Sequence, residues 1–272
     1  MSKLHTTIAC LAWLLTPVAF GQTSQGGAPK PAVKQGVEGR TYTPGPFDRI
    51  ELSGTTHVRL QQGEQDQVFI VGDAQLQDSV AVSVTQGRLD IRCVETWKFW
   101  PGKRLEVEVT LRRLRELVLS GAGELHAPDA FKAGPLSIRI SGAGSVRFDD
   151  LWAERLDFAI SGAGDGYLRG GVNLLDLRIS GKGKLLAEHL HAESANIKIS
   201  GIGSAEVWVS EKLNLNVSGV GQVDYWGQPT VTRSTSGIAK VNGRGDRRAP
   251  PAPPMAPAPP AAPVAPALPV RQ

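Results

Sequence analysis

The chain has few cysteines, few aromatic residues and no strong excess of charge of one sign. Of its 272 residues, 2 are cysteine, and Phe, Trp and Tyr together make up 6%. Cys10 lies in an N-terminal segment that we expect to be cleaved, so Cys93 remains as a single thiol and an internal disulfide is excluded. The formal net charge of +4 is too small to indicate a nucleic-acid partner. Stability must therefore come from packing.

Long apolar runs are confined to the N-terminus, and apolar residues at helical spacing are lacking throughout. Lys3, the apolar stretch 8–20 and the small residues Ala19 and Gly21 are typical of a secretory signal peptide over residues 1–21. This stretch is too short for a stable membrane span, and no later segment approaches its length. We expect an exported bacterial protein, in the periplasm or on the outer cell surface, without a transmembrane segment after cleavage.

Two segments flanking the centre have a linker-like composition. Residues 22–46 are rich in Gly, Pro, Gln and Thr, which predicts a flexible linker. Residues 246–272 form a tail composed mainly of Pro and Ala, which predicts a disordered or extended spacer. Just before this tail, Arg244-Gly245-Asp246 is the tripeptide that integrins recognise, and we interpret it as a chance occurrence in a basic, exposed segment.

The centre of the chain, by contrast, is repetitive. Ser-Gly pairs recur at intervals of 21, 20, 19, 20, 18 and 18 residues, with their serines at Ser120, Ser141, Ser161, Ser180, Ser200, Ser218 and Ser236. A period near 20 residues is typical of a stack of small units that bury their apolar faces against each other. Most copies continue as Gly-x-Gly, which indicates a tight corner where φ can become positive at little cost.

Each Ser-Gly pair follows a segment in which apolar residues alternate with polar ones. Leu136, Ile138 and Ile140 precede one copy, and Leu156, Phe158 and Ile160 precede the next. Period-two alternation predicts a half-buried strand, and strands that recur in one orientation favour parallel stacking. We predict an all-β fold, a right-handed parallel β-helix (β-solenoid) over residues 47–245. The register extends back to Ser53, so at about 20 residues per coil we expect roughly ten coils.

These motifs resemble those of a known bacterial family. The Ser-Gly-Ala-Gly copies that begin at Ser120, Ser141 and Ser161, together with the entry segment 47–54 (FDRIELSG), are similar to the putative auto-transporter adhesin head GIN domain, a domain of unknown function. The resemblance covers roughly residues 47–245. It implies an exported β-helical protein with an adhesin-like role, and it implies no catalytic residues.

Several patterns could carry chemistry, and we interpret each as structural. The Gly-x-Gly corners lack the following helix of a phosphate loop. The segment around Asp165 is similar to part of a calcium-binding repeat, but the equivalent of Asp165 in the next coil is Lys184, which excludes a shared calcium ladder. His189 and His191 offer two nitrogens to a metal, and we expect an exposed pair without one. The repeated serines lack a companion His, so we expect their hydroxyls to close strand-end hydrogen bonds.

We expect functional residues where the sequence departs from the repeat. Trp97, Lys98, Phe99 and Trp100 interrupt it, and aromatic rings beside a cation can stack on sugars or fill a partner's pocket. We predict a non-enzymatic binding, adhesin-like or scaffolding role with a cell-surface glycan or envelope protein as partner, possible self-association, no metal and no cofactor. One alternative is a polysaccharide-active enzyme using the stacked carboxylates of Asp157 and Asp176. Another is a purely structural periplasmic spacer.

Overall fold

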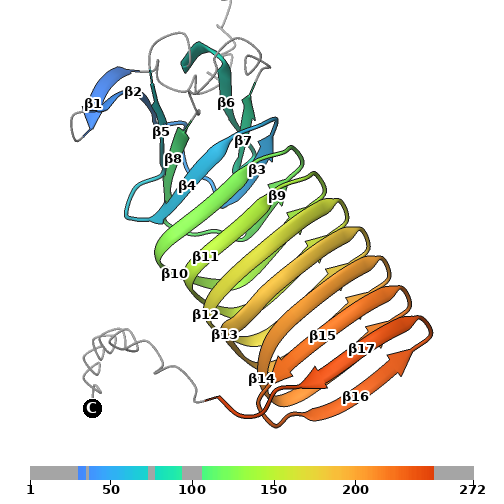
Figure 1. Cartoon of the computed structure of the whole chain (residues 1–272). Coiled ribbons are helices and arrows are strands. Elements are labelled where there is room, and N and C mark those ends of the chain that lie inside the picture. The colour runs from blue at the N-terminus through green and yellow to red at the C-terminus, as the bar shows by residue number, and fades with distance from the viewer. Residues whose placement is uncertain (1–29, 35–36, 73–76, 94–105, 248–272) are drawn as a thin grey trace, which may run out of the picture.

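The structure is a computed structural model that describes residues 30–34, 37–72, 77–93 and 106–247. It is a β-solenoid of about 6 turns, closed at its N-terminal end by shorter strands (Figure 1). The strands of the stack are β9 (Glu116–Leu119), β10 (Glu124–Ile140), β11 (Ser145–Ile160), β12 (Ala163–Ile179), β13 (Lys182–Ile199), β14 (Ile202–Val217), β15 (Val220–Trp226), β16 (Thr230–Thr235) and β17 (Ile238–Gly243). The predicted all-β solenoid fold is confirmed.

The core consists of columns of apolar side chains that run along the inside of the stack. Ile138 pairs with Phe158 of the next coil, and Phe158 pairs in turn with Leu177. The inward positions one, three and five places before each Ser are at most 3% exposed from Leu136 to Val217. Burial of each such side chain stabilises the fold by about 1.5–3 kcal/mol. The alternation in the sequence therefore identifies the core correctly.

The number of coils is smaller than the roughly ten that the period predicts, because the strands over residues 67–71 and 80–85 run antiparallel to their neighbours instead of stacking parallel to them. β3 (Arg49–Ser53) and β4 (His57–Gln62) make the first coil, parallel to β9 and β10. On their other side lie β7 (Arg88–Cys93) and β8 (Glu106–Leu111), and β6 (Val80–Thr85) and β5 (Gln67–Val71) pair antiparallel with these two. Alternation is the same in parallel and antiparallel strands, so it did not distinguish them.

A hairpin turn explains why the chain reverses in this region. Gln86 and Gly87, between β6 and β7, have φ of 50° and 75°. Positive φ at both central residues is the geometry of the tight two-residue hairpin. β5 and β6 therefore close the N-terminal end of the stack, in which β7 and β8 still pair parallel with β3 and β4.

The predicted flexible linker, residues 22–46, contains two strands. β1 (Lys30–Lys34) pairs antiparallel with β2 (Val37–Tyr42), and β2 pairs antiparallel with β5. At Gly39, which is buried, a Cβ atom would lie 2.4 Å from Cζ of Phe69. This close contact allows a segment with a linker-like composition to add a strand to the cap.

The corners are where successive coils approach most closely. A Cβ added to the first glycine of each corner would lie 2.0–2.1 Å from the carbonyl oxygen of the equivalent glycine one coil earlier. These glycines are Gly121, Gly142, Gly162, Gly181, Gly201, Gly219 and Gly237. Within the column that they form with Gly54, only Gly54 has a positive φ. Close approach of two backbones, not positive φ, is thus why the repeat requires glycine.

Hydrogen bonds between backbones hold the corners together. The Ser161 N–H donates to the carbonyl of Ile140 at 2.9 Å, and the Lys182 N–H donates to that of Gly162 at 2.9 Å. The same two bonds recur from coil to coil. The serine amide therefore makes the strand-end bond that we expected of the hydroxyl. The hydroxyl adds a bond of 3.1 Å at Ser120, and longer ones of 3.5 Å at Ser141 and Ser180.

The last coil ends the stack with polar residues. Among the described strands, β16 pairs with β14 alone and β17 with β15 alone, so both leave an edge free. Arg233 and Thr235 occupy the positions in register with the buried Leu215 and Val217. A charged residue at an inward position discourages the addition of another strand. This arrangement does not favour the end-to-end association of rods.

A buried carboxylate ties the end of the described chain to the last coils. Asp224 accepts hydrogen bonds from Gln222, Asn242 and Arg244 at 2.6, 2.8 and 2.9 Å. Burial disfavours the charged form, but these hydrogen bonds and the charge of Arg244 outweigh it, so the pKa of Asp224 lies below its ordinary value of 3.8. The ionised carboxylate therefore stabilises the folded end of the solenoid.

We predict that Gly181→Ala destabilises the protein by about 3 kcal/mol, because its methyl group would overlap the carbonyl of Gly162 and displace the hydrogen bond from Lys182. Urea denaturation followed by circular dichroism measures the effect. Lys182→Ala is the control, because the Lys182 side chain is exposed in the same corner. It should alter the free energy of unfolding by less than about 0.5 kcal/mol. Equal stability of the two variants would contradict the close-approach explanation.

We predict that Asp224→Asn lowers the melting temperature at pH 7 and that this difference shrinks in acid. A lowered folded-state pKa contributes stability that is complete above about pH 5 and is lost as pH falls through the folded pKa. Thermal unfolding of both proteins between pH 7 and pH 3 tests this, with Ser234→Ala as a non-titrating control at the same end. A difference that stays constant over this range would show that the charge of Asp224 is not stabilising.

Candidate functional site

A long hollow runs lengthwise along the Gly-x-Gly corners. Its volume is about 1060 Å³, and coils from Thr55 and His57 to Lys240 line it. The second glycine of each corner forms its floor, at Gly123, Gly144, Gly164, Gly183, Gly203 and Gly221. The residues on either side of this glycine form two walls. We call this hollow the corner furrow.

One wall of the corner furrow is apolar over most of its length. It consists of the residues that follow the first glycine of each corner: Ala122, Ala143, Ala163, Lys182, Ile202, Val220 and Ile238. Ile202 pairs with Val220, which pairs with Ile238, and these side chains are 59%, 47% and 74% exposed. Single exposed aliphatic residues are common, but three stacked in register form a continuous apolar strip.

The other wall is polar and carries both signs of charge. Its residues are His57, Glu124, Ser145, Asp165, Lys184, Ser204, Gln222 and Lys240. His57 Nδ1 lies 3.1 Å from Glu124 Oε2, and Lys184 Nζ lies 3.2 Å from Glu206 Oε1. The described residues contain no group of three or more His, Cys, Asp or Glu that could hold a metal ion. This wall therefore presents hydrogen-bonding groups beside the apolar strip.

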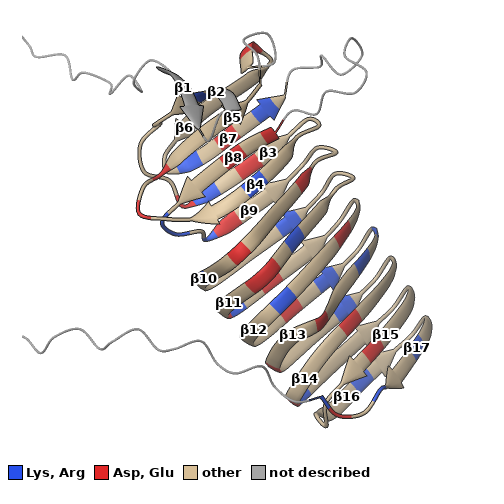
Figure 2. Cartoon of the chain, turned by 60° about the vertical axis from the view of Figure 1, so that its left-hand side comes forward, with Lys and Arg blue, Asp and Glu red and all other residues tan. Residues whose placement is uncertain are grey.

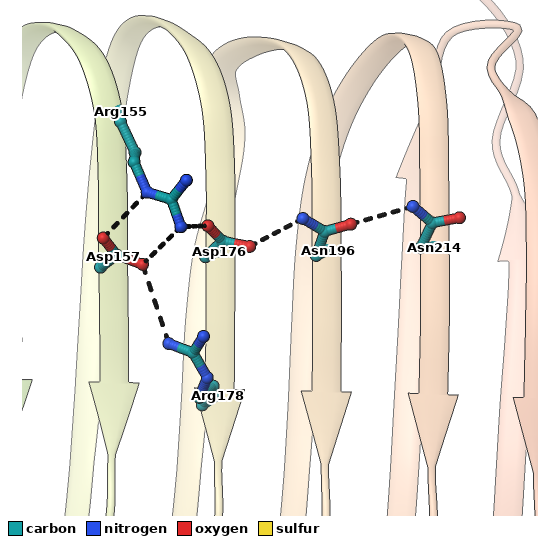
Figure 3. A network of polar contacts seen from close by, with 6 residues as sticks. All are labelled: Arg155, Asp157, Asp176, Arg178, Asn196 and Asn214. Atoms are coloured by element: carbon teal, nitrogen blue, oxygen red, sulfur yellow. Dashed lines mark hydrogen bonds and ion pairs between the residues drawn. The ribbon is translucent and has the colours of Figure 1, made fainter. Parts of the chain in front are cut away.

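The outer face of the second strand of each coil carries a network of polar side chains (Figure 3). Arg155 donates to Asp157 at 3.1 Å and also to Asp176. Asp176 accepts a bond of 2.7 Å from Asn196, and Asn196 accepts one of 2.9 Å from Asn214. Arg178 lies 3.7 Å from Asp157. Acidic and basic residues are interspersed along these strands (Figure 2).

This network bears on the enzyme alternative. Asp157 and Asp176 do stack on adjacent coils, as the repeat predicts, and their Cα atoms pair directly. However, Arg155 bridges the two carboxylates, and Asp176 is buried and bonded to Asn196. A pair of glycosidase carboxylates needs one oxygen free to protonate a substrate and one free to attack or activate water. Here the carboxylates instead hold neighbouring coils together.

The two histidines considered as metal ligands have other contacts. The His191 ring lies edge-on to Trp208 with a centroid distance of 5.0 Å. His189 Nε2 lies 3.4 Å from Glu188 Oε1, and its Nδ1 lies 3.2 Å from Arg247 Nη1. Their rings thus pack and pair on the surface of a second bend of each coil, within the long strands where the register shifts, which we call the looser corner.

The looser corner carries a column of aromatic residues that the Ser-Gly repeat does not reveal. Trp152, Gly171, His191, Trp208 and Trp226 follow each other in register on successive coils. The Trp152 ring covers Gly171, where a Cβ would lie 2.6 Å from Cζ3. β-Bulges shift the register here, so an alignment on the serines did not superimpose these residues. Trp208 is only 6% exposed and packs against His191, so it is not available to a ligand.

The integrin-like tripeptide is occupied by contacts within the chain. Arg244 Nε donates to Asp224, and Asp246 accepts a bond of 2.6 Å from Gln228. Beyond them, the Arg247 guanidinium lies 4.4 Å from the centroid of the Trp226 ring and donates to the Glu188 carbonyl at 2.9 Å. These contacts fasten the end of the described chain to the looser corner and support the interpretation of a chance match.

The predicted binding residues Trp97, Lys98, Phe99 and Trp100 lie outside the described residues. They follow β7 and precede β8, both of which belong to the N-terminal cap. Within the described residues, no helix is long and apolar enough to span a membrane.

Comparison with solved structures identifies the fold. A putative adhesin from Bacteroides fragilis is similar, with a TM-score of 0.71 and 22% identity over 79% of this chain and 99% of that chain. A putative lipid binding protein from Parabacteroides distasonis has a TM-score of 0.62 and 19% identity over 78% and 96% of the two chains. A putative adhesin from Parabacteroides merdae has a TM-score of 0.56 and 19% identity over 77% and 95%.

Comparison of sequences gives the family. No curated protein matches the chain. The family described as "Putative auto-transporter adhesin, head GIN domain" matches residues 46–229, which contain the Ser-Gly corners from Ser53 to Ser218 and both walls of the corner furrow over that range. The chain belongs to this family of auto-transporter adhesin head GIN domains.

Proposed function

We propose that this protein is a non-enzymatic, adhesin-like binding protein of the bacterial envelope that holds an extended glycan in the corner furrow. The observation that carries this proposal is the exposed strip of Ile202, Val220 and Ile238 beside a row of polar side chains. Exposed apolar patches on folded proteins mark interaction sites. The signal-like N-terminus and the adhesin names of similar proteins support an exported location.

The shape of the furrow suits a sugar polymer. A sugar ring has an apolar face of C–H groups and a rim of hydroxyls, so one wall can pack against the face while the other bonds the rim. Successive coils are separated by about 4.8 Å, which is close to the advance of one sugar in an extended chain. Each coil therefore offers one residue of each wall to one sugar. A peptide advances by only about 3.3 Å per residue and would lose this register.

The rigidity of the furrow also favours binding. Its floor is the hydrogen-bonded corner ladder, where Ile202 N–H donates to the carbonyl of Gly181 at 3.0 Å and Val220 N–H to that of Gly201 at 2.9 Å. A site built on such backbone loses little conformational entropy when a ligand binds. Many weak, repeated contacts on a rigid surface can hold a polymer without chemical change.

We predict that Ile202→Glu/Ile238→Glu weakens glycan binding by at least about tenfold, because it replaces apolar contacts with charge at two coils. The measurement is binding to a panel of immobilised bacterial and host polysaccharides, with melting temperature as a check of folding. Asn216→Glu/Ser234→Glu, which adds equal charge on the face that carries the polar network of Asp176, Asn196 and Asn214 (the flat face), is the matched control and should bind normally.

Three outcomes would overturn this assignment. Full binding by the furrow variant would show that the ligand lies elsewhere. Turnover of a polysaccharide, abolished by Asp157→Ala or Asp176→Ala, would favour the enzyme. The absence of binding to every member of the panel would favour the structural spacer.

Trp97 and Trp100 are proposed as additional anchors for a surface ligand, since buried tryptophans dominate many interfaces. We predict that Trp97→Ala/Trp100→Ala weakens the binding of the protein to cells by about tenfold and leaves the β-sheet circular dichroism intact. Lys103→Ala, in the same stretch between β7 and β8 but outside the four predicted binding residues, serves as a control. Unchanged binding by the double variant would exclude these residues as anchors and leave the furrow assignment standing.

A further inference from the structure

A second hollow, of about 410 Å³, lies where the N-terminal cap meets the solenoid. Four segments converge on it: the entry to β3, the loop between β4 and β5, the turn between β6 and β7, and the loop between β8 and β9. Its charged lining residues are Asp48, Arg49, Asp66, Arg112, Arg113 and Arg115. We call it the arginine pocket. It is distinct from the corner furrow, with which it shares no lining residue.

The charges of the arginine pocket do not cancel. Asp66 is committed to Arg112, which contacts its Oδ2 at 2.6 and 3.1 Å. Asp48 is shared between Arg49 at 3.6 Å and Arg115 at 3.4 Å. The Arg113 side chain has no ion pair or hydrogen bond with any described residue. Four guanidinium groups thus face two carboxylates, which leaves an excess of two positive charges.

The pairing of Asp66 with Arg112 is firm. The Asp66 carboxylate is only 5% exposed and also accepts a 2.9 Å bond from the Arg112 backbone N–H. Burial raises the pKa of Asp66, but the hydrogen bonds and the charge of Arg112 outweigh this effect and hold the pKa below 3.8. Asp66 therefore stays ionised at neutral pH, and its charge is neutralised by Arg112.

The loop that carries Arg113 and Arg115 is held in place by backbone hydrogen bonds and a buried leucine. Leu114 is buried between Arg113 and Arg115, and the Arg115 N–H donates to the Asp48 carbonyl at 2.8 Å. The Arg112 carbonyl accepts a 3.0 Å bond from Gln62. On the opposite side, the Arg49 guanidinium donates to the carbonyl of Gln86 in the hairpin turn. Arg113 and Arg115 are consequently presented on fixed backbone, with little entropy left to lose on binding.

We infer that the arginine pocket binds a phosphate group. A phosphate monoester carries a charge of about −1.5 to −2 at pH 7, which matches the excess of the pocket. Guanidinium groups offer paired N–H donors that fit phosphate oxygens, and donors from several directions suit its tetrahedral shape. The source of the group is either a lipid headgroup or a soluble phosphate, and both present the same chemistry.

The test begins with inorganic phosphate at low ionic strength, because salt screens exposed charges. Chemical shifts of the arginine Nε–H groups are followed as phosphate is added to the protein. We expect saturable binding, weakened at least about tenfold in Arg113→Gln/Arg115→Gln. Arg169→Gln/Lys198→Gln removes the same charge from other exposed positions and should bind phosphate as the wild type does. The single variant Arg113→Gln removes no described contact, so its expected loss of affinity is independent of folding.

A second arm identifies the source of the phosphate. Vesicles of phosphatidylcholine with and without phosphatidate are sedimented with each protein. Phosphatidate-dependent sedimentation that is lost in Arg113→Gln/Arg115→Gln supports a lipid headgroup, whereas phosphate binding without sedimentation supports a soluble ligand. No saturable phosphate binding, or an equal loss in the Arg169→Gln/Lys198→Gln control, overturns the proposal. Neither result affects the corner furrow.

Discussion

The contact between glycine backbones at the corners is the constraint on which the rest of the structure depends. The first glycine of each corner lies so close to the preceding coil that a Cβ would come within 2.0–2.1 Å of a carbonyl oxygen. This proximity lets corner amides donate across coils, so the hydrogen-bonded ladder continues from one strand through the turn into the next. Without it, each coil would carry unpaired backbone groups at its sharpest bend, at a cost in stability.

A stack held in this way places equivalent side chains of successive coils in rows. The residues in each row determine whether that part of the molecule forms core, binding surface or contacts between coils. Inward rows become the core from Phe47 to Val223. The middle residue of each corner points outward, and its identity changes from Ala143 through Lys182 to Ile238 without disturbing the ladder. Binding chemistry can therefore vary along the corner furrow while the backbone stays the same. On the flat face, the row from Asp176 to Asn214 serves instead to join coils.

The ends of the solenoid are built differently from the repetitive coils in its middle. At the N-terminal end, antiparallel strands close the stack and create the arginine pocket where they meet the first coil. At the other end, Arg233 at an inward position and the bonds around Asp224 finish the last coil. Both features lie where the repeat weakens. The corner furrow, by contrast, is a product of the repeat itself, although the repeat had suggested no binding role for its corners.

The sequence by itself determined the solenoid, its inward residues and the positions of the Ser-Gly corners. Alternation and a 20-residue period are local properties, and they recur in each coil. The sequence did not reveal that β5 and β6 run antiparallel to β8 and β7, since a strand's pattern is the same in either direction. It did not align Trp152 with His191 and Trp208, because bulges change the coil length between them. Only the tertiary structure brought Arg49, Arg112 and Arg115 around one hollow and Ile202, Val220 and Ile238 into one strip. These groupings depend on how coils and caps lie against each other, which is a property of packing rather than of any single segment.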